Sequence, residues 1–160
     1  MLANFPSYFI LYQHLLPSQF LFSCITISLM INFIKTYLIA GGVYWLVDFI
    51  WLALIANKFY QRQLEGLLAD NIKWPAAIIF YTLYPIGVII FAVMPGLNEA
   101  SLSKTLLRGA LFGFFTYATY DLSNYITLAN WPIKVVITDI LWGMFISLLV
   151  AFAGFQASNI

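Results

Sequence analysis

Three aspartates, Asp48, Asp121 and Asp139, lie within long apolar stretches of a chain that has only 8% charged residues. A carboxylate at the centre of a membrane helix costs roughly 2.5–3.5 kcal/mol on insertion scales, so such residues usually face a partner or a wet cavity. Intramembrane acids serve in proton relays and ion pathways. The sequence therefore predicts a binding or translocation site for protons, a cation or a small polar solute. If a metal binds, these three carboxylates are its expected ligands.

Four apolar segments are long enough to carry these residues across a bilayer, which takes roughly 20 residues of helix. We predict membrane-spanning helices near residues 37–56, 74–95, 109–129 and 134–155. The connection around Ala129 and Asn130 is so short that the last two helices must be antiparallel neighbours. The predicted fold is an all-α membrane protein, a four-transmembrane-helix bundle.

The three aspartates are predicted to lie at one depth in this bundle. Trp74 and Trp131 begin the second and fourth spans and mark one membrane face, because tryptophan prefers the headgroup level. Asp48 and Asp121 precede the ends of their spans by eight residues, and Asp139 follows Trp131 by eight. At a rise of 1.5 Å per residue, each aspartate lies about 12 Å inside that face. We therefore expect a polar layer at this depth.

Aromatic and amide side chains extend the predicted layer. An Asp-x-x-Trp unit occurs twice and places the indoles of Trp51 and Trp142 one helical turn from an acid. On the third span, Gly109 and Gly113 form a Gly-xxx-Gly step that lets another helix approach closely. Beside the three acids, the candidate binding residues of the layer are Asn124, Tyr120, Trp51, Trp142 and Tyr81.

Composition excludes several other classes of protein. Hydrophobic residues make up 63% of the chain, which is far above the proportion in soluble domains and indicates an integral membrane protein. The net charge of +1 and the lack of a basic run argue against nucleic acid as a partner. Cys24 and His14 are the only cysteine and histidine, so zinc and haem sites lack ligands. The sequence identifies no cofactor.

Residues 1–29 are interpreted as a peripheral apolar N-terminal extension, and residues 30–160 as the membrane domain. The first 34 residues contain no Lys, Arg, Asp or Glu and lack the basic region of a signal peptide. Residues 20–34 are apolar but short, and Lys35 leaves no room for a turn before the next span. Translation from Met30 and an interfacial segment are the two explanations of this extension.

Three functions of different classes fit the pattern. The first is a small transporter or channel-like carrier, which with four spans would work as a homodimer. The second is a membrane-embedded enzyme acting on a lipid or isoprenoid, with the acids holding Mg²⁺ or acting as a general acid–base pair. The third is a structural or accessory subunit. Hydrogen bonds between membrane helices contribute only about 0.6 kcal/mol on average, so stability alone explains three carboxylates poorly.

Residues 35–154 resemble an uncharacterised bacterial membrane-protein family, domain of unknown function 2177. The resemblance depends on segments in all four spans and in the first loop: Val47-Asp48-Phe49-Ile50-Trp51-Leu52, Phe59-Tyr60-Gln61-Arg62-Gln63-Leu64, Trp74-Pro75-Ala76-Ala77, Phe80-Tyr81, Phe91-Ala92-Val93-Met94-Pro95, Gly109-Ala110-Leu111-Phe112-Gly113, Tyr117-Ala118-Thr119-Tyr120-Asp121-Leu122-Ser123-Asn124 and Asp139-Ile140-Leu141-Trp142-Gly143. The chain departs from the family pattern at Ser123, where threonine is usual, and at Gly96, where alanine is usual. The resemblance implies a four-span protein of the bacterial inner membrane, with the lipid bilayer as its partner, and it supplies no activity.

Overall fold

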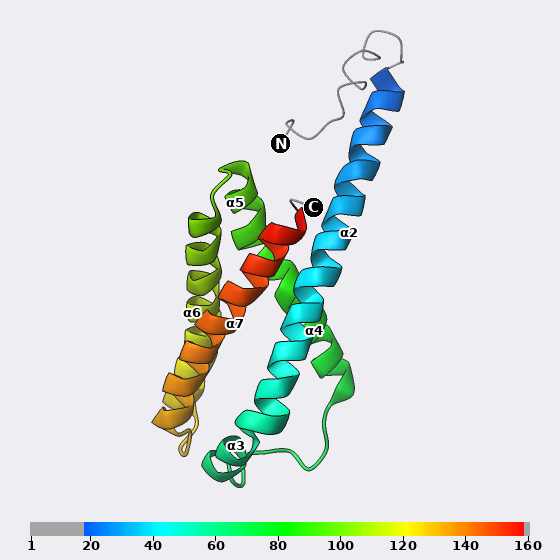
Figure 1. Cartoon of the computed structure of the whole chain (residues 1–160). Helices are drawn as coiled ribbons and strands as arrows, with labels where there is room; N and C mark the ends of the chain where they lie inside the picture. Colours follow the sequence, from blue (N-terminus) through cyan, green and yellow to red (C-terminus); the bar gives the residue numbers. More distant parts are fainter. Residues whose placement is uncertain (1–17, 159–160) are drawn as a thin grey trace.

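The computed structural model describes residues 18–158, and this part of the chain forms helices joined by turns (Figure 1). In chain order the helices are α2 (Ser18–Ile50), η1 (Trp51–Ile55), α3 (Asn57–Gln63), α4 (Trp74–Val88), η2 (Ile89–Val93), α5 (Met94–Asn98), α6 (Leu102–Thr127) and α7 (Ile133–Ser158). The elements η1 and η2 are short π-helical turns. The predicted all-α fold is confirmed for the described residues.

The first helix is longer than predicted. α2 begins at Ser18 and continues to Ile50, whereas the first span was expected near residues 37–56. Residues 18–40 contain neither proline nor glycine, so no residue there favours a helix end. Residues 18–29 of the predicted extension therefore belong to α2, and residues 1–17 lie outside the described part of the chain. Figure 1 shows the N-terminal turns of α2 extending beyond the other helices.

The second predicted span corresponds to one helical stretch, Trp74–Asn98, formed by α4, η2 and α5. Pro85 lies inside α4, and the wider turn η2 follows it, which is a common way for a helix to accommodate the hydrogen bond lost at proline. The helix does not end at Pro95, where the second predicted span ends, but continues through α5 to Asn98, with Pro95 directly after the wider turn η2.

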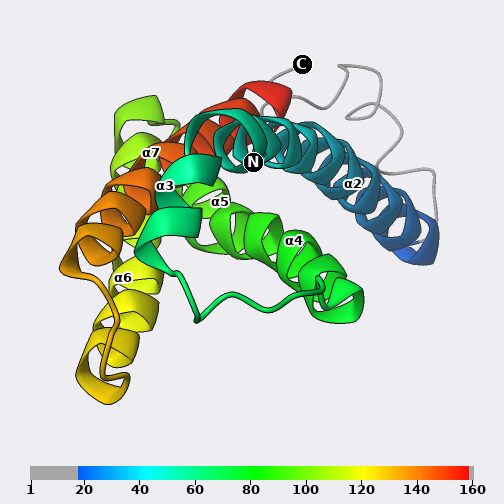
Figure 2. The same ribbon diagram turned by 90° about the horizontal axis from the view of Figure 1, so that it is seen from below.

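α6 and α7 pack against each other as the short connection between them predicts (Figures 1 and 2). Glycines allow the two backbones to approach closely. A Cβ atom on Gly109 would lie 2.7 Å from Cβ of Ala151, and a Cβ atom on Gly113 would meet the carbonyl oxygen of Gly143. A Cβ atom on Gly143 would meet the ring of Tyr117. These contacts fix the distance between α6 and α7.

Three helical stretches of the described chain are long and apolar enough to cross a membrane: Ser23–Ile55, Trp74–Asn98 and Ile133–Ser158. They contain three of the four predicted spans. α6 has the same length as α7, but it carries Lys104, Arg108 and Asp121 together with several hydroxyl side chains and is less apolar. Composition therefore supports three spans directly, and a membrane-spanning role for α6 stays a prediction.

The core between α2, α4 and α7 holds these helices in place. Tyr44 and Tyr84 are buried and stack with ring centroids 5.0 Å apart. The Tyr84 hydroxyl forms a 2.6 Å hydrogen bond with Ser147 Oγ on α7. α3 lies across one end of the bundle, where it contacts η1 and α7 (Figure 2). This packing positions the side chains of α2, α3, α4 and α7 around one pocket.

Candidate functional site

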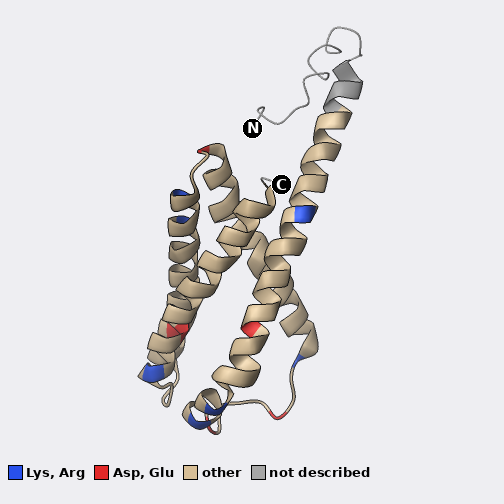
Figure 3. Ribbon diagram, in the orientation of Figure 1, with Lys and Arg blue, Asp and Glu red and all other residues tan. Residues whose placement is uncertain are grey.

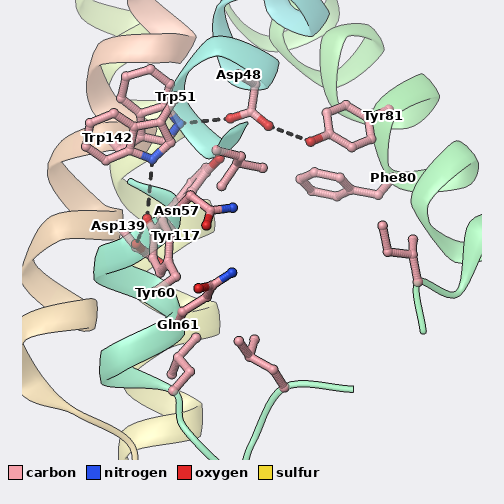
Figure 4. Close-up of a pocket in the computed structure, with 14 residues that line it drawn as sticks. Asp48, Trp51, Asn57, Tyr60, Gln61, Phe80, Tyr81, Tyr117, Asp139 and Trp142 are labelled. Atoms are coloured by element: carbon pink, nitrogen blue, oxygen red, sulfur yellow. Dashed lines mark hydrogen bonds between the residues drawn. The ribbon is translucent and has the colours of Figure 1, made fainter. Parts of the chain in front are cut away.

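An open pocket of about 550 Å³ lies at the end of the bundle that carries α3 (Figure 4). Its wall combines two carboxylates, six aromatic rings, two amides and four aliphatic side chains. The lining residues are Asp48, Asp139, Trp51, Trp142, Tyr60, Phe80, Tyr81, Tyr117, Asn57, Gln61, Leu52, Leu64, Leu68 and Ile72. The pocket therefore brings together five of the residues singled out in the sequence, namely Asp48, Asp139, Trp51, Trp142 and Tyr81.

Asp48 is held by donors from two other helices. It is only 4% exposed. The indole nitrogen of Trp142 on α7 donates to Asp48 Oδ1 at 2.9 Å, and the hydroxyl of Tyr81 on α4 donates to Asp48 Oδ2 at 2.6 Å. Figure 4 shows the carboxylate between these two aromatic side chains. Asp48 thus links α2, α4 and α7 through one side chain.

Asp139 is half-buried on α7 and is held from α3. The hydroxyl of Tyr60 donates to Asp139 Oδ1 at 2.5 Å. The same hydroxyl accepts a 3.3 Å hydrogen bond from the indole nitrogen of Trp51. Among the described residues, no hydrogen bond reaches Asp139 Oδ2. This carboxylate therefore keeps one oxygen available to a ligand.

In each of the two Asp-x-x-Trp units, the indole contacts the acid of the other unit, either directly or through Tyr60. The sequence placed each tryptophan beside the acid of its own helix, but Trp142 donates to Asp48 of α2, and Trp51 reaches Asp139 of α7 only through Tyr60. The two indoles stack between the helices, with centroids 4.3 Å apart and planes 10° from parallel. The direct donor to Asp48 is therefore an indole from another helix, and the tryptophan one turn away along the chain is not its hydrogen-bond partner.

The third acid lies outside the pocket. Asp121 is fully buried on α6 and accepts a 3.3 Å hydrogen bond from the indole nitrogen of Trp131. Its Oδ2 atom and the Nδ2 atom of Asn124 are buried without a hydrogen-bond partner. Tyr120 is 58% exposed and meets Trp131 edge-to-face. Asp121, Asn124 and Tyr120 therefore form a separate group beside the connection between α6 and α7.

The expected metal ligation by three aspartates is not met. No group of three or more His, Cys, Asp or Glu side chains within the described residues could hold a metal ion. Figure 3 shows acidic positions at a similar level on α2 and on the pair α6–α7. A similar level does not bring them into one cluster, because Asp48 and Asp139 line the pocket and Asp121 does not.

The pocket carboxylates have no basic partner. Ion pairs among the described residues join Glu99 to Lys104 at 2.7 Å and to Arg108 at 2.5 Å, near the start of α6. Hydrogen bonds from Lys104 and then Arg108 hold the pKa of Glu99 below its ordinary value. Neither Asp48 nor Asp139 forms an ion pair with a described lysine or arginine. Their hydrogen-bond donors are neutral indole and phenol groups, which leave the negative charge uncompensated.

Some lining residues were not expected from the polar pattern. Asn57, Tyr60 and Gln61 lie between the first two predicted spans, but they form part of α3 and line the pocket. Tyr60 belongs to the stretch Phe59-Tyr60-Gln61-Arg62 that carries part of the family resemblance, and this was the available signal. Tyr117 shares a helix face with Gly113, which was also visible in the sequence.

Comparison with known proteins gives one relationship. No curated protein and no solved structure matches the chain. A family model described as "Predicted membrane protein (DUF2177)" matches residues 33–156, which include all of the pocket-lining side chains. The match begins after residues 1–29, which were interpreted as an N-terminal extension. The chain therefore belongs to the DUF2177 family of predicted membrane proteins.

Proposed function

We propose that this integral membrane protein binds a small cation, a proton or a small polar solute in the pocket between α2, α3, α4 and α7, and that it moves this ligand across the membrane. The observation that carries the proposal is that Asp48 and Asp139 line the pocket without a basic partner. A bacterial cytoplasmic membrane, with α6 as a fourth span, is the proposed setting.

Electrostatics supports a positively charged ligand. A carboxylate among apolar groups is costly unless it is paired or protonated. Hydrogen bonds from neutral donors stabilise the carboxylates but add no positive charge. A bound cation or a proton would supply that charge, and the pocket is open to it.

A homodimer would supply the additional helices that a carrier with so few spans requires. This expectation from the sequence remains part of the proposal. Glu99 provides a comparison for the pocket acids. It is a carboxylate between α5 and α6 that pairs with Lys104 and Arg108 and does not line the pocket.

The test is current measurement in proteoliposomes on a solid-supported membrane after a rapid change of pH or of cation. Wild-type protein is expected to give transient currents that the double variant Asp48→Asn/Asp139→Asn lacks. Glu99→Gln should keep the currents, provided that each variant elutes as a single species with unchanged helical circular dichroism. Currents that persist in the double variant would refute the pocket as the site.

A structural or accessory role is the second candidate, because each aspartate accepts a hydrogen bond from a side chain on another element. Asp48 joins α2 to α4 and α7, and Asp139 joins α7 to α3. If this role is the whole function, wild-type protein will give no current with any ion, and Asp48→Asn will lower the thermal stability. A stoichiometric membrane partner in a pull-down would then favour the accessory subunit.

A further inference from the structure

We infer that the ligand of the pocket is an organic ammonium ion, that is, a small amine or quaternary ammonium group with apolar substituents. This inference rests on the proposed function and narrows its ligand class. It is carried by the combination of aromatic rings and separately held carboxylates on the wall of one pocket.

Aromatic side chains form much of the wall. The rings come from η1, α3, α4, α6 and α7, namely those of Trp51, Tyr60, Phe80, Tyr81, Tyr117 and Trp142. A ring face attracts a cation that lies within about 6 Å of its centroid, and the attraction grows when the site excludes water. Cages of such rings recognise quaternary ammonium groups. The wall therefore suits a cation that carries carbon substituents.

The carboxylates suit the same cation better than they suit a metal. Mg²⁺ and Ca²⁺ require about six or more oxygen ligands, and Mg²⁺ loses its hydration water reluctantly. The described residues provide no cluster of three metal-binding side chains, and Asp48 already accepts one hydrogen bond on each oxygen. Asp139 keeps Oδ2 free of hydrogen bonds from the described residues. One free carboxylate oxygen beside aromatic faces is sufficient for an ammonium group.

Size and polarity agree with this ligand class. The pocket volume of about 550 Å³ falls within the roughly 300–1,000 Å³ that is typical of small-molecule sites. Leu64, Leu68 and Ile72 offer apolar contacts for the substituents, and Asn57 and Gln61 offer amides for a hydroxyl or similar polar group. A free solute and the headgroup of a lipid both present this ammonium chemistry to the wall.

The experiment is isothermal titration of full-length protein in phosphatidylglycerol nanodiscs, which contain no ammonium headgroup. Choline is the probe, and 3,3-dimethyl-1-butanol is its neutral isostere. We expect choline to bind saturably. The isostere should bind at least about tenfold more weakly, because it lacks the positive charge that would pair with a carboxylate in a desolvated site. Excess Na⁺ or Mg²⁺ should not displace choline. This comparison uses wild-type protein, so it does not depend on the folding of a variant.

Variants locate the site. Asp139→Asn should weaken choline binding by about tenfold or more, because it removes the negative charge that would pair with the ammonium group in a partly buried site. Glu99→Gln removes a carboxylate that pairs with Lys104 and Arg108 away from the pocket, and it should leave the affinity unchanged. Choline binding that survives in both Asp139→Asn and Asp48→Asn would overturn the assignment to this pocket.

The remaining outcomes separate the ligand class from the proposed function. If the neutral isostere binds as tightly as choline, the ammonium inference fails. If Na⁺ or Mg²⁺ binds in place of choline and Asp139→Asn abolishes that binding, the ammonium class fails while the proposed function stands. Repeating the titration in phosphatidylcholine nanodiscs identifies the source: lost choline binding assigns the site to a lipid headgroup, and unchanged binding assigns it to a free solute.

Discussion

The indole nitrogen of Trp142 donates a 2.9 Å hydrogen bond to Asp48 Oδ1, which joins α7 to α2 inside the apolar part of the bundle. The two residues are 94 positions apart in the chain. Trp142 also stacks on Trp51, so one indole contacts both Asp48 and η1, the turn that follows α2. This single contact fixes the relative position of the two helices that carry the pocket carboxylates.

Replacing Trp142 with phenylalanine should therefore destabilise the protein. Asp48 would lose one of its two donors, and hydrogen bonds to charged groups contribute about 1.5–3 kcal/mol. We expect a loss of this order in the free energy of unfolding in mixed detergent micelles. Trp74→Phe is the matched control, because Trp74 is 65% exposed. Equal losses in the two variants would show that the Trp142–Asp48 hydrogen bond contributes little.

The helix content and the antiparallel pair α6–α7 could be predicted because they depend on local patterns. Apolar length identifies membrane helices, and the short connection after Thr127 leaves only one arrangement of its neighbours. The glycines of α6 and the position of Asp48 eight residues before the expected span end were also visible in the sequence. These features require no knowledge of how the helices are rotated about their axes.

The grouping of the acids could not be predicted, because it depends on how the helices are rotated about their axes. Counting residues from a helix end gives the depth of a side chain, but it does not give the direction in which the side chain points. Asp121 has a similar predicted depth to Asp139, yet it meets Trp131 instead of the pocket. The exchange of indoles between Trp51 and Trp142 depends on side-chain rotamers and on the packing of two helices, which spacing along one helix does not determine.

Tyr60→Phe should release α3 from the end of the bundle. The Tyr60 hydroxyl donates to Asp139 and accepts from Trp51, so its removal breaks two contacts of α3 at once. We expect faster amide hydrogen exchange over residues 57–63 and a loss of about 1.5–3 kcal/mol in the free energy of unfolding, as for a hydrogen bond to a charged group. Tyr125→Phe removes a hydroxyl from a side chain that is 48% exposed and should change neither quantity. Unchanged exchange in Tyr60→Phe would mean that α3 is held by its other contacts.

Acidification should weaken the end of the bundle at which α6 begins. Hydrogen bonds from Lys104 and Arg108 lower the pKa of Glu99, so the folded state favours the ionised carboxylate. Its stabilising contribution is present above the unfolded pKa of about 4.3 and is lost as the pH falls through the lower folded value. Below about pH 4.3, the thermal midpoint of Glu99→Gln should depend less on pH than that of the wild type. Added salt should also weaken this pH dependence in the wild type, because it screens the ion pairs. If the thermal midpoint of Glu99→Gln falls at low pH as much as that of the wild type, other carboxylates cause the loss of stability.

Two glycine-to-alanine variants should change stability in opposite directions. A Cβ atom on Gly113 would meet the carbonyl oxygen of Gly143, so Gly113→Ala must push α6 away from α7. Overpacking of this kind costs about 1–3 kcal/mol. Gly42 lies within α2, and a Cβ atom there would meet nothing within 4 Å. Gly42→Ala should therefore stabilise the protein by about 0.5–1 kcal/mol, because alanine leaves the unfolded chain fewer conformations than glycine does. Unfolding in mixed micelles measures both changes. A neutral Gly113→Ala would mean that the two helices can separate without losing other contacts.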